Sequence, residues 1–433
     1  MTKASRIHCG TPCHLFLWVN AMFRPSILIC KALQKIARLK GGGSALPGLL
    51  AQKLDPRLLG DVLSRLPLGV AVISGTNGKT TTTRIVSELL SARGLRVFTN
   101  KTGSNFVRGI LSALLKEISW DGRFDFDIAV LELDEAHAVR FLEAAPVDYC
   151  LILNVCRDQL DRFCEIDHTA ALLAKTARAA RKAAVLNRED PLVAALPSAN
   201  TVFYGLDESL RPLFPSDEDL LAPAGQEEGT PDQKDADVVL MSLTGREALY
   251  RMDGEDFPCS LSLEGAFNAF NGAGALSLCR QILGKDKSPD LVRALSGVEE
   301  AFGRGEVLHK DGKEVRLILV KNPAAFRQSL LSFGGKGGSV MIAINDRDAD
   351  GRDVSWLWNV DFSALSSVHT VSGTRAAEMA LRLKYDQVPV SFAEPDLGEA
   401  LEGFMKAPGP RQIFATYTAM LEIRKHLTGR SLV

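Results

Sequence analysis

Short apolar runs alternate with amphipathic stretches along most of this chain. The run from Val70 to Ile73 predicts a buried strand, and the apolar stripe of helical spacing from Ile85 to Leu90 ends at Gly94. Further strands are predicted over 126–133, 149–155 and 183–187, with a helix over 168–182. Strands that alternate with helices predict a mostly parallel sheet covered on both faces.

A second α/β unit is predicted to begin near Ala301. It has no phosphate loop of its own, which favours a Rossmann-like domain. Its five expected strands are 316–320, 339–344, 367–371, 388–392 and 412–416. We therefore expect three parts, namely an N-terminal extension with an amphipathic helix (1–43), a central domain (44–300) and a C-terminal domain (301–433).

Two segments lack the pattern of a packed domain. Residues 207–237 are rich in Asp, Glu, Pro, Gly and Gln, which predicts an acidic loop before the sheet resumes at Val238. The glycine-rich stretch GGGSALPG, residues 41–48, predicts a flexible joint after a helix that begins at Pro25. The first 21 residues have no long apolar region and no signal-peptide cleavage site, and Met22 is an alternative start.

Composition narrows the function classes. The chain has 433 residues and a formal net charge of −1, so electrostatics indicates neither a nucleic-acid partner nor an anionic membrane. No apolar run approaches the roughly 18 residues that a membrane span needs. The eight cysteines include no CxxC pair, which favours a reduced cytosolic protein with incidental thiols.

The stretch ISGTNGKTTTT, residues 73–83, carries the clearest chemistry. A strand, a glycine loop and a helix N-terminus together form an arrangement that cradles phosphate, because free N–H groups meet the anion there. Lys79 would reach the outer phosphates of ATP, and the Thr80 hydroxyl would bind Mg²⁺. An ordinary strand-to-helix turn is the alternative. The predicted ATP-binding residues of the loop are Gly75, Thr76, Asn77, Gly78, Lys79, Thr80 and Thr81.

Polar side chains follow the next predicted strands. Glu132 ends an apolar strand and is our candidate Mg²⁺ carboxylate, with Asp134 and Glu135 as neighbours that could replace it. Acids that cap the next helix are the alternative. Asn154 ends the following strand and would face the same crevice, and the charged stretch RDQLDR (157–162) follows it.

A glycine- and alanine-rich helix offers a candidate adenine site. Asn268 and Asn271 lie three residues apart, on one helix face, beside Phe267 and Phe270. Core packing with helix capping explains this spacing equally well. Arg304, in AFGRGE, would lie in a hinge between the two domains, where an arginine can close onto a γ-phosphate; a solvated arginine is the alternative.

The stretch AINDRDADGRDVSWLW, residues 343–358, crowds acids at the end of a predicted strand, where α/β sites form. The EF-hand spacing and terminal Glu are missing. A polar turn is one interpretation, and Trp356 and Trp358 favour a packed or partner-facing surface. The polar residues are Asn345, Asp346, Asp348, Asp350 and Asp353.

Together these motifs resemble the Mur ligase superfamily, whose phosphate loop reads GTNGKT. Within it the chain is similar to the MurT family, the ligase-like subunits of lipid II isoglutaminyl synthases. The similarity covers nearly the whole chain from about Met22 and rests most specifically on DGRDVSWLW. Other shared motifs are GGGSALPG, NKTGSN, RDQLDRF, AFGRGE, VKNPAAF and TYTAML.

The resemblance implies a fold and an activity. The fold would be Mur-ligase-like α/β, a P-loop central ATPase domain with a parallel sheet plus a C-terminal Rossmann-like domain. ATP and Mg²⁺ would activate the α-carboxylate of D-glutamate in the peptide of lipid II as an acyl phosphate, for amidation to D-isoglutamine. Ammonia would come from a separate glutaminase subunit, GatD, in a heterodimer. The reaction would take place in the bacterial cytoplasm, at the inner face of the membrane.

Residue by residue, the resemblance matches Lys79 to the phosphate lysine, Thr80 and Glu132 to the Mg²⁺ ligands, and Asn268 and Arg304 to nucleotide contacts. An aspartate of the C-terminal domain would complete the partner's cysteine–histidine site. Asp353 is the best match and Asp350 the next.

Three features depart from related ligases. Gln159 stands where amino-acid-adding Mur ligases place a metal-binding histidine, as it does in MurT chains. Ala174, next to Lys175, falls where many Mur ligases keep a carbamylated lysine. MurT proteins usually carry a four-cysteine zinc ribbon, whereas this chain has the acidic loop 207–237, so zinc is not predicted.

Two rival functions remain at this point. A stand-alone ligase of the folylpolyglutamate or peptidoglycan type would need an amino acid in place of ammonia. A non-catalytic nucleotide-binding scaffold would keep the loop and lose the chemistry; the presence of Lys79, Thr80, Glu132 and Arg304 argues against it.

Overall fold

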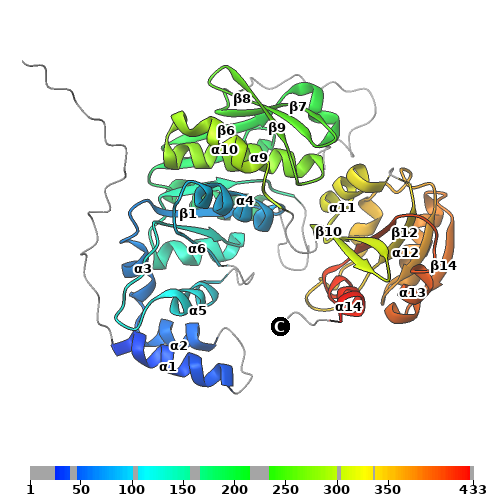
Figure 1. Ribbon diagram of the computed structural model, residues 1–433, viewed down its shortest axis with the longest axis horizontal. Coiled ribbons are helices and arrows are strands. Elements are labelled where there is room, and N and C mark those ends of the chain that lie inside the picture. The colour runs from blue at the N-terminus through cyan, green and yellow to red at the C-terminus, as the bar shows by residue number, and fades with distance from the viewer. Residues whose placement is uncertain are drawn as a thin grey trace, which may run out of the picture.

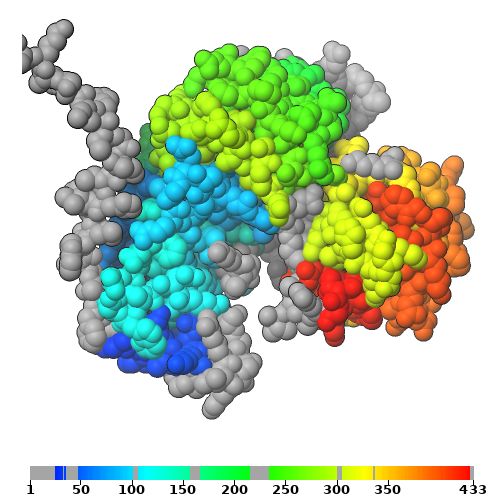
Figure 2. Space-filling view, in the orientation of Figure 1, coloured from blue at the N-terminus to red at the C-terminus, as the bar shows by residue number. Residues whose placement is uncertain are grey.

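The computed structural model describes residues 25–39, 46–100, 106–156, 166–214, 234–299, 304–334 and 337–429. They form two α/β units, each built on one sheet (Figure 1). In the space-filling view a hollow separates the C-terminal unit (yellow to red) from the helices at the N-terminal end of the first unit (Figure 2).

The first unit has a nine-stranded sheet in the order β2-β3-β1-β4-β5-β6-β7-β8-β9. Strands β2 to β7 are parallel to their neighbours, and β8 and β9 extend the sheet as antiparallel hairpins. The strands are β1 (Gly69–Ser74), β2 (Val97–Phe98), β3 (Ile128–Glu132), β4 (Tyr149–Ile152), β5 (Ala183–Asn187), β6 (Thr201–Leu206), β7 (Val238–Thr244), β8 (Glu247–Met252) and β9 (Glu255–Ser260).

Helices cover both faces of this sheet, because successive side chains of each strand point to opposite faces. Ala71 and Ile73 of β1 pack under α4, α9 and α10, while Val70 and Val72 pack against the layer that contains α3, α5 and α6. The helices are α1 (Pro25–Leu39), α2 (Leu46–Leu54), α3 (Leu58–Leu63), α4 (Lys79–Ala92), α5 (Val107–Glu117), α6 (Glu135–Ala144), α7 (Ile166–Ala179), α8 (Pro191–Ala194), η1 (Glu208–Leu213), α9 (Ala266–Leu283), η2 (Lys285–Lys287) and α10 (Ser288–Leu295).

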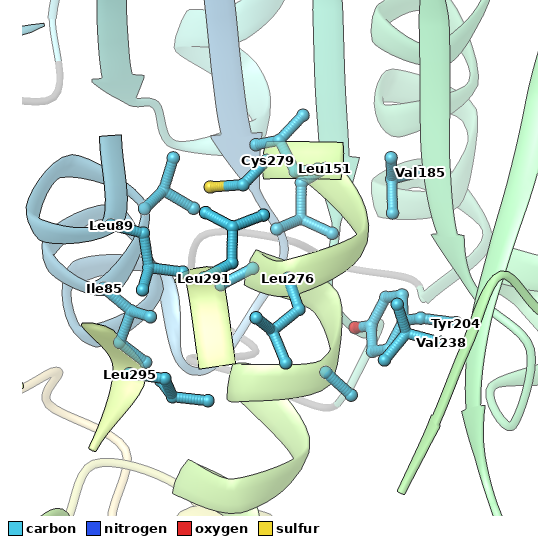
Figure 3. Close-up of a cluster of buried hydrophobic side chains, with 14 of the residues drawn as sticks. Ile85, Leu89, Leu151, Val185, Tyr204, Val238, Leu276, Cys279, Leu291 and Leu295 are labelled. Carbon is cyan, nitrogen blue, oxygen red and sulfur yellow. The ribbon is translucent and has the colours of Figure 1, made fainter. Parts of the chain in front are cut away.

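The cluster between α4, α9, α10 and the sheet fixes where the phosphate loop lies. Figure 3 shows Ile85 and Leu89 of α4 against Leu276 of α9 and Leu291 of α10, and all four are fully buried. Since α4 begins directly at the end of the loop, this packing holds the helix N-terminus at the carboxyl end of β1.

The C-terminal unit has a six-stranded sheet in the order β10-β11-β15-β12-β13-β14, in which β10 alone is antiparallel to its neighbour. Its strands are β10 (Arg304–Lys310), β11 (Lys313–Leu319), β12 (Ser339–Ala343), β13 (Val368–Ser372), β14 (Val390–Glu394) and β15 (Arg411–Ala415). Its helices are α11 (Pro323–Ser329), η3 (Leu330–Gly334), η4 (Ser355–Asn359), α12 (Ala376–Tyr385), α13 (Leu397–Phe404) and α14 (Tyr417–Thr428).

The expected α/β architecture is confirmed, and so are the five predicted C-terminal strands, within two or three residues at either end. The expectation of a hinge at AFGRGE is wrong in part, because Arg304 begins strand β10. Its register pairs Arg304 with Ile318 of β11, so the main chain is held in a sheet from that residue onward.

Two predicted irregular segments are also partly regular. Within 207–237, residues Glu208–Leu213 form a 3₁₀ helix whose Leu210 is buried, and residues 215–233 lie outside the described part. Within 41–48, helix α2 already begins at Leu46. At 207–237 the buried Leu210 overrides the polar composition around it.

No helix among the described residues has both the length and the apolar character that crossing a bilayer requires.

Truncation of a leucine in the central cluster tests the packing that holds α4. Leu276→Ala leaves a cavity beneath a fully buried side chain, so it should lower the free energy of unfolding by about 3 kcal/mol. Urea unfolding followed by circular dichroism measures the change. The control is Leu54→Ala, at a position that is 53% exposed, with an expected effect below about 0.5 kcal/mol. Equal losses in the two variants would contradict this account of the core.

Candidate active site

The phosphate loop lies between β1, which ends at Ser74, and α4, which begins at Lys79. Gly75 has a φ angle of 129° and Gly78 one of 87°, which side-chain-bearing residues rarely adopt. A Cβ atom on Gly78 would also lie 2.9 Å from the amide of Asn271. Both glycines are therefore required by the shape of the loop.

Asn154, just beyond β4, holds the loop in place. Its carbonyl accepts a hydrogen bond from Thr76 N at 3.0 Å, and its Oδ1 accepts one from Asn77 N at 2.8 Å. Its Nδ2 donates to Asn77 O at 3.1 Å. A Cβ atom on Gly75 would lie only 3.0 Å from the Asn154 main chain. Asn154 therefore lies at the predicted crevice, where its hydrogen bonds hold the shape of the phosphate loop.

Lys79 and Thr80 lie at the start of α4 with acids opposite. The Lys79 ammonium donates to Gly75 O and lies 3.7 Å from Glu135 Oε1. The Thr80 hydroxyl donates to Glu132 Oε1 at 3.0 Å. The structure therefore brings together the hydroxyl and the carboxylate that sequence predicts as Mg²⁺ ligands, and oxygen donors of this kind suit that cation.

Glu132 is set by its strand and by a neighbour. It is 7% exposed, and its main chain exchanges two hydrogen bonds with the Asn100 side chain, at 2.8 and 3.0 Å. The sequence also allowed the acids after this strand to cap the next helix. Asp134 does occupy the N-cap position of α6, but its side chain makes no capping hydrogen bond. Glu135 instead reaches Lys79.

Two residues that sequence reasoning missed approach the loop from the C-terminal unit. The Lys321 ammonium donates to Thr76 O at 2.9 Å, and the Asn322 side chain exchanges hydrogen bonds with that of Asn77 at 3.1 and 3.4 Å. Their signal was present in VKNPAAF, since a lysine and an Asn-Pro helix start follow directly after an apolar strand. The phosphate loop of the first unit is therefore also contacted by the second unit.

The two kinds of residue in the predicted adenine site, aromatic and amide, have different surroundings. Phe270 is a core residue, because its ring packs against Tyr204 at 5.1 Å and Phe214 at 5.3 Å. Asn268 is 2% exposed; its Nδ2 donates to Glu264 O at 2.7 Å, and its Oδ1 has no hydrogen-bond partner. A buried acceptor without a partner is costly, and an exocyclic amine such as that of adenine would satisfy it.

Further polar groups link this region to the second unit. Glu264 forms an ion pair with Arg316 of β11 at 3.1 Å, and both side chains are 17% exposed. The Thr81 hydroxyl is buried at the start of α4 and has no hydrogen-bond partner. Arg304 begins β10, and its side chain lies outside the described part of the chain.

The acids of the stretch 343–358 have different surroundings. Asp350 is 7% exposed, and both its oxygens accept hydrogen bonds from Thr418 at the start of α14. Thr374 and Arg375 bond to Asp346, and the Thr374 hydroxyl lowers the pKa of this carboxyl most. Asp353 is only partly buried, and its sole hydrogen bond to another described residue is the one that Oδ1 accepts from Ser355 N at 2.8 Å.

This comparison separates the two candidate acids. Both carboxylate oxygens of Asp350 hold the loop after β12 to the start of α14. The Oδ2 atom of Asp353 accepts no hydrogen bond from another described residue, so it is available to a partner. Nearby, Trp356 packs on Phe326 as predicted for a packed side chain, and Trp358 is 49% exposed beside Tyr385.

The structure describes only some of the positions at which the sequence departs from related ligases. Gln159 and the rest of 157–162 lie outside them. Lys175 on α7 is exposed, and Ala174 is partly buried. In the ranges that the structure describes, no three His, Cys, Asp or Glu side chains cluster as a metal site would need, and the segment 215–233 is not among them.

Comparison with protein families gives two matches along the chain. The Mur ligase middle domain matches residues 73–279, and the MurT ligase C-terminal domain matches residues 319–420. The MurT subunit of lipid II isoglutaminyl synthase (glutamine-hydrolyzing) from Streptococcus pneumoniae is 30% identical, over 91% of this chain and 94% of that protein. The corresponding subunit from Staphylococcus aureus is 30% identical, over 93% and 97%.

Solved structures show the same fold. A pseudomurein peptide ligase type C from Methanothermus fervidus superposes with a TM-score of 0.67 at 19% identity, covering 85% of this chain and 80% of that one. MurF from Thermotoga maritima, solved in complex with ADP, has a TM-score of 0.61 at 19% identity, with coverage of 86% and 83%.

A methyl group in the phosphate loop tests its geometry. Gly78→Ala places a Cβ against the Asn271 amide in a left-handed conformation, so we expect affinity for ATP to fall about tenfold or more. Binding of a fluorescent ATP analogue measures it. The matched control is Gly94→Ala at the other end of α4, where φ is 80° and no atom lies within 4 Å of the added carbon. Equal affinities in the two variants would show that the loop tolerates the collision.

Proposed function

Because this chain belongs to the MurT family of the Mur ligase superfamily, a family of ATP-dependent ligases, we propose that it amidates the D-glutamate α-carboxylate in the peptide of lipid II. The product would be D-isoglutamine, a step of peptidoglycan synthesis. The similarity to MurT subunits over nine-tenths of the chain carries this proposal most strongly. The contacts of Lys321 and Asn322 from the second unit with the phosphate loop support it.

ATP would bind across the loop. Main-chain N–H groups of the loop other than those of Thr76 and Asn77, which donate to Asn154, would hold the β- and γ-phosphates together with the Lys79 ammonium, as such loops do. The cradle closed by both glycines fits a phosphate, and the unpaired Oδ1 of Asn268 fits the adenine amine. Arg304 would contact the γ-phosphate from the C-terminal unit. We expect Mg²⁺, held by Thr80 and Glu132, to offset phosphate charge.

The chemistry would proceed in two steps. An oxygen of the acceptor carboxylate attacks the γ-phosphorus, the bond from that phosphorus to the bridging oxygen breaks, and ADP leaves. Ammonia then attacks the carbonyl carbon of the acyl phosphate, and the carbon–oxygen bond to phosphate breaks. The proton lost from nitrogen passes to solvent or phosphate. Lys79 would bind the transferring oxygens and stabilise the charge that develops on them.

Ammonia would come from a glutaminase partner in a heterodimer. Asp353 is our candidate for the acid that completes the partner's cysteine–histidine site, because it lies at the surface of the C-terminal unit with one carboxylate oxygen available. A buried aspartate that is already bound on both oxygens, such as Asp350, could not orient a histidine of another chain. The lipid-linked substrate would place the reaction at the inner face of the bacterial membrane.

The synthetase step can be tested without the partner. Purified chain with ATP, Mg²⁺, lipid II and a high concentration of ammonium salt should give amidated lipid II, detected by mass spectrometry, with ADP released in parallel. Lys79→Ala removes the ammonium that holds the phosphates and should abolish both products. Amide formation only with an added amino acid would favour a stand-alone ligase. ATP that is bound but never spent, even with a co-expressed glutaminase, would favour a scaffold.

A pair of conservative substitutions tests the assignment of the acid. Asp353→Asn should reduce glutamine-dependent amidation about a hundredfold or more in the complex, because the histidine would lose its orienting charge. Ammonium-dependent amidation and ATP binding should stay unchanged.

Asp350→Asn is the matched variant for that assignment. This substitution weakens the hydrogen bonds to Thr418, so it should lower the midpoint temperature of thermal unfolding. It should reduce amidation by the same factor with glutamine and with ammonium. Full glutamine-dependent activity of Asp353→Asn would refute the role of Asp353.

A further inference from the structure

Beside the phosphate loop lies a group of four side chains to which the reaction steps above give no task. Phe106, directly before α5, and His137 on α6 stack edge to face with ring centroids 4.3 Å apart. Arg108 follows on α5 and Arg140 on α6. We call these four residues the α5–α6 cluster. Helix α6 packs against both β1 and α5, so the cluster belongs to the face of the sheet opposite α4 and α9 (Figure 1).

The cluster is adjacent to the reacting groups. Glu135 lies 3.7 Å from the Lys79 ammonium, and His137 follows it by two residues on the same first turn of α6. Phe106 extends the chain of contacts from His137 to α5. The cluster is thus linked to the acid that faces Lys79 through the first turn of α6.

The two arginines have no counter-charge of their own. Both side chains are exposed, and neither forms an ion pair with another residue in the ranges that the structure describes. By contrast, Arg93, Arg181 and Arg246 of the first unit each pair with an acid at 2.6 to 2.9 Å. A pair of unopposed guanidinium groups suits anionic oxygens, which they can bind in a bidentate manner.

The other two members add a neutral surface. Phe106 is 46% exposed, which is unusual for an aromatic ring so close to a polar site. Burial lowers the pKa of His137, and the charges of Arg140 and Arg108 lower it further against the opposing charge of Asp134. The imidazole is therefore neutral near pH 7, and the positive charge of the cluster belongs to the arginines alone.

We propose that Arg108 and Arg140 bind anionic oxygens of the acceptor outside its reacting carboxylate, while Phe106 and His137 contact its uncharged portion. This proposal rests on the proposed function, since it assigns the acceptor subsite of the same reaction. The anionic oxygens have two sources in a lipid-linked muramyl peptide, namely the diphosphate and the remaining peptide carboxylates. Both offer the same chemistry to a guanidinium group.

Steady-state kinetics with ammonium as the nitrogen source tests the subsite. Arg108→Ala and Arg140→Ala should each raise the KM for lipid II about tenfold and leave kcat and the KM for ATP unchanged, because each removes one charge-assisted contact made before and during the reaction. Arg108→Lys should recover part of the loss. The control is Arg293→Ala on α10, whose side chain is 81% exposed and which should change neither KM.

A second acceptor separates the two sources of charge. With a water-soluble disaccharide peptide that lacks the diphosphate, the penalty of the arginine variants disappears if they bind the diphosphate and persists if they bind a peptide carboxylate. Either result supports the subsite. An unchanged KM for both acceptors in both variants would overturn it.

Direct binding keeps the inference independent of turnover. Lipid II in nanodiscs, titrated onto immobilised protein with a non-hydrolysable ATP analogue, should bind about tenfold more weakly to either arginine variant than to the wild type or Arg293→Ala. Equal binding would overturn the subsite even if the wild type forms amide. If the wild type forms no amide with ammonium or with a glutaminase, the proposed function fails, and the binding comparison still decides whether the arginines hold the acceptor.

Discussion

The hydrogen bonds between Asn154 and the phosphate loop are the constraint on which the site depends. They join the carboxyl ends of the adjacent parallel strands β1 and β4, so the loop is as rigid as the sheet beneath it. Each such bond contributes only about 1 kcal/mol net, but breaking them would leave main-chain groups of the loop without partners, at a higher cost. The glycines follow from this arrangement, because Gly75 must pass within contact distance of Asn154.

The second unit is coupled to this loop by a small number of polar contacts. Lys321 and Asn322 reach Thr76 and Asn77, and the ion pair of Arg316 with Glu264 lies next to the main-chain carbonyl that holds Asn268. The phosphate loop and the buried Asn268 side chain are thus both linked to the position of the C-terminal unit. Interfaces of this polar kind permit relative motion of the units more readily than apolar ones.

Sequence predicts the local parts of this structure well and its long-range parts poorly. Strand β1, the loop and α4 are recognisable because apolar period and glycine position agree. Strand β10 was missed because two glycines flank Arg304 and favour a hinge, while pairing with β11 decides its conformation. Phe270 looks like an adenine contact until Tyr204 and Phe214, distant in sequence, are seen to surround it. Lys321 and Asp350 likewise acquire their roles only from residues far along the chain.

The acidic segment 207–237 enters and leaves the first unit between β6 and β7, and the strand order separates β6 from β1 by β4 and β5. At the usual spacing of strands, that junction lies roughly 15 Å from the loop. A module can therefore be gained, lost or exchanged there while the nucleotide site keeps its geometry. Divergence in sequence at this junction between β6 and β7 can thus proceed independently of the residues that form the phosphate loop.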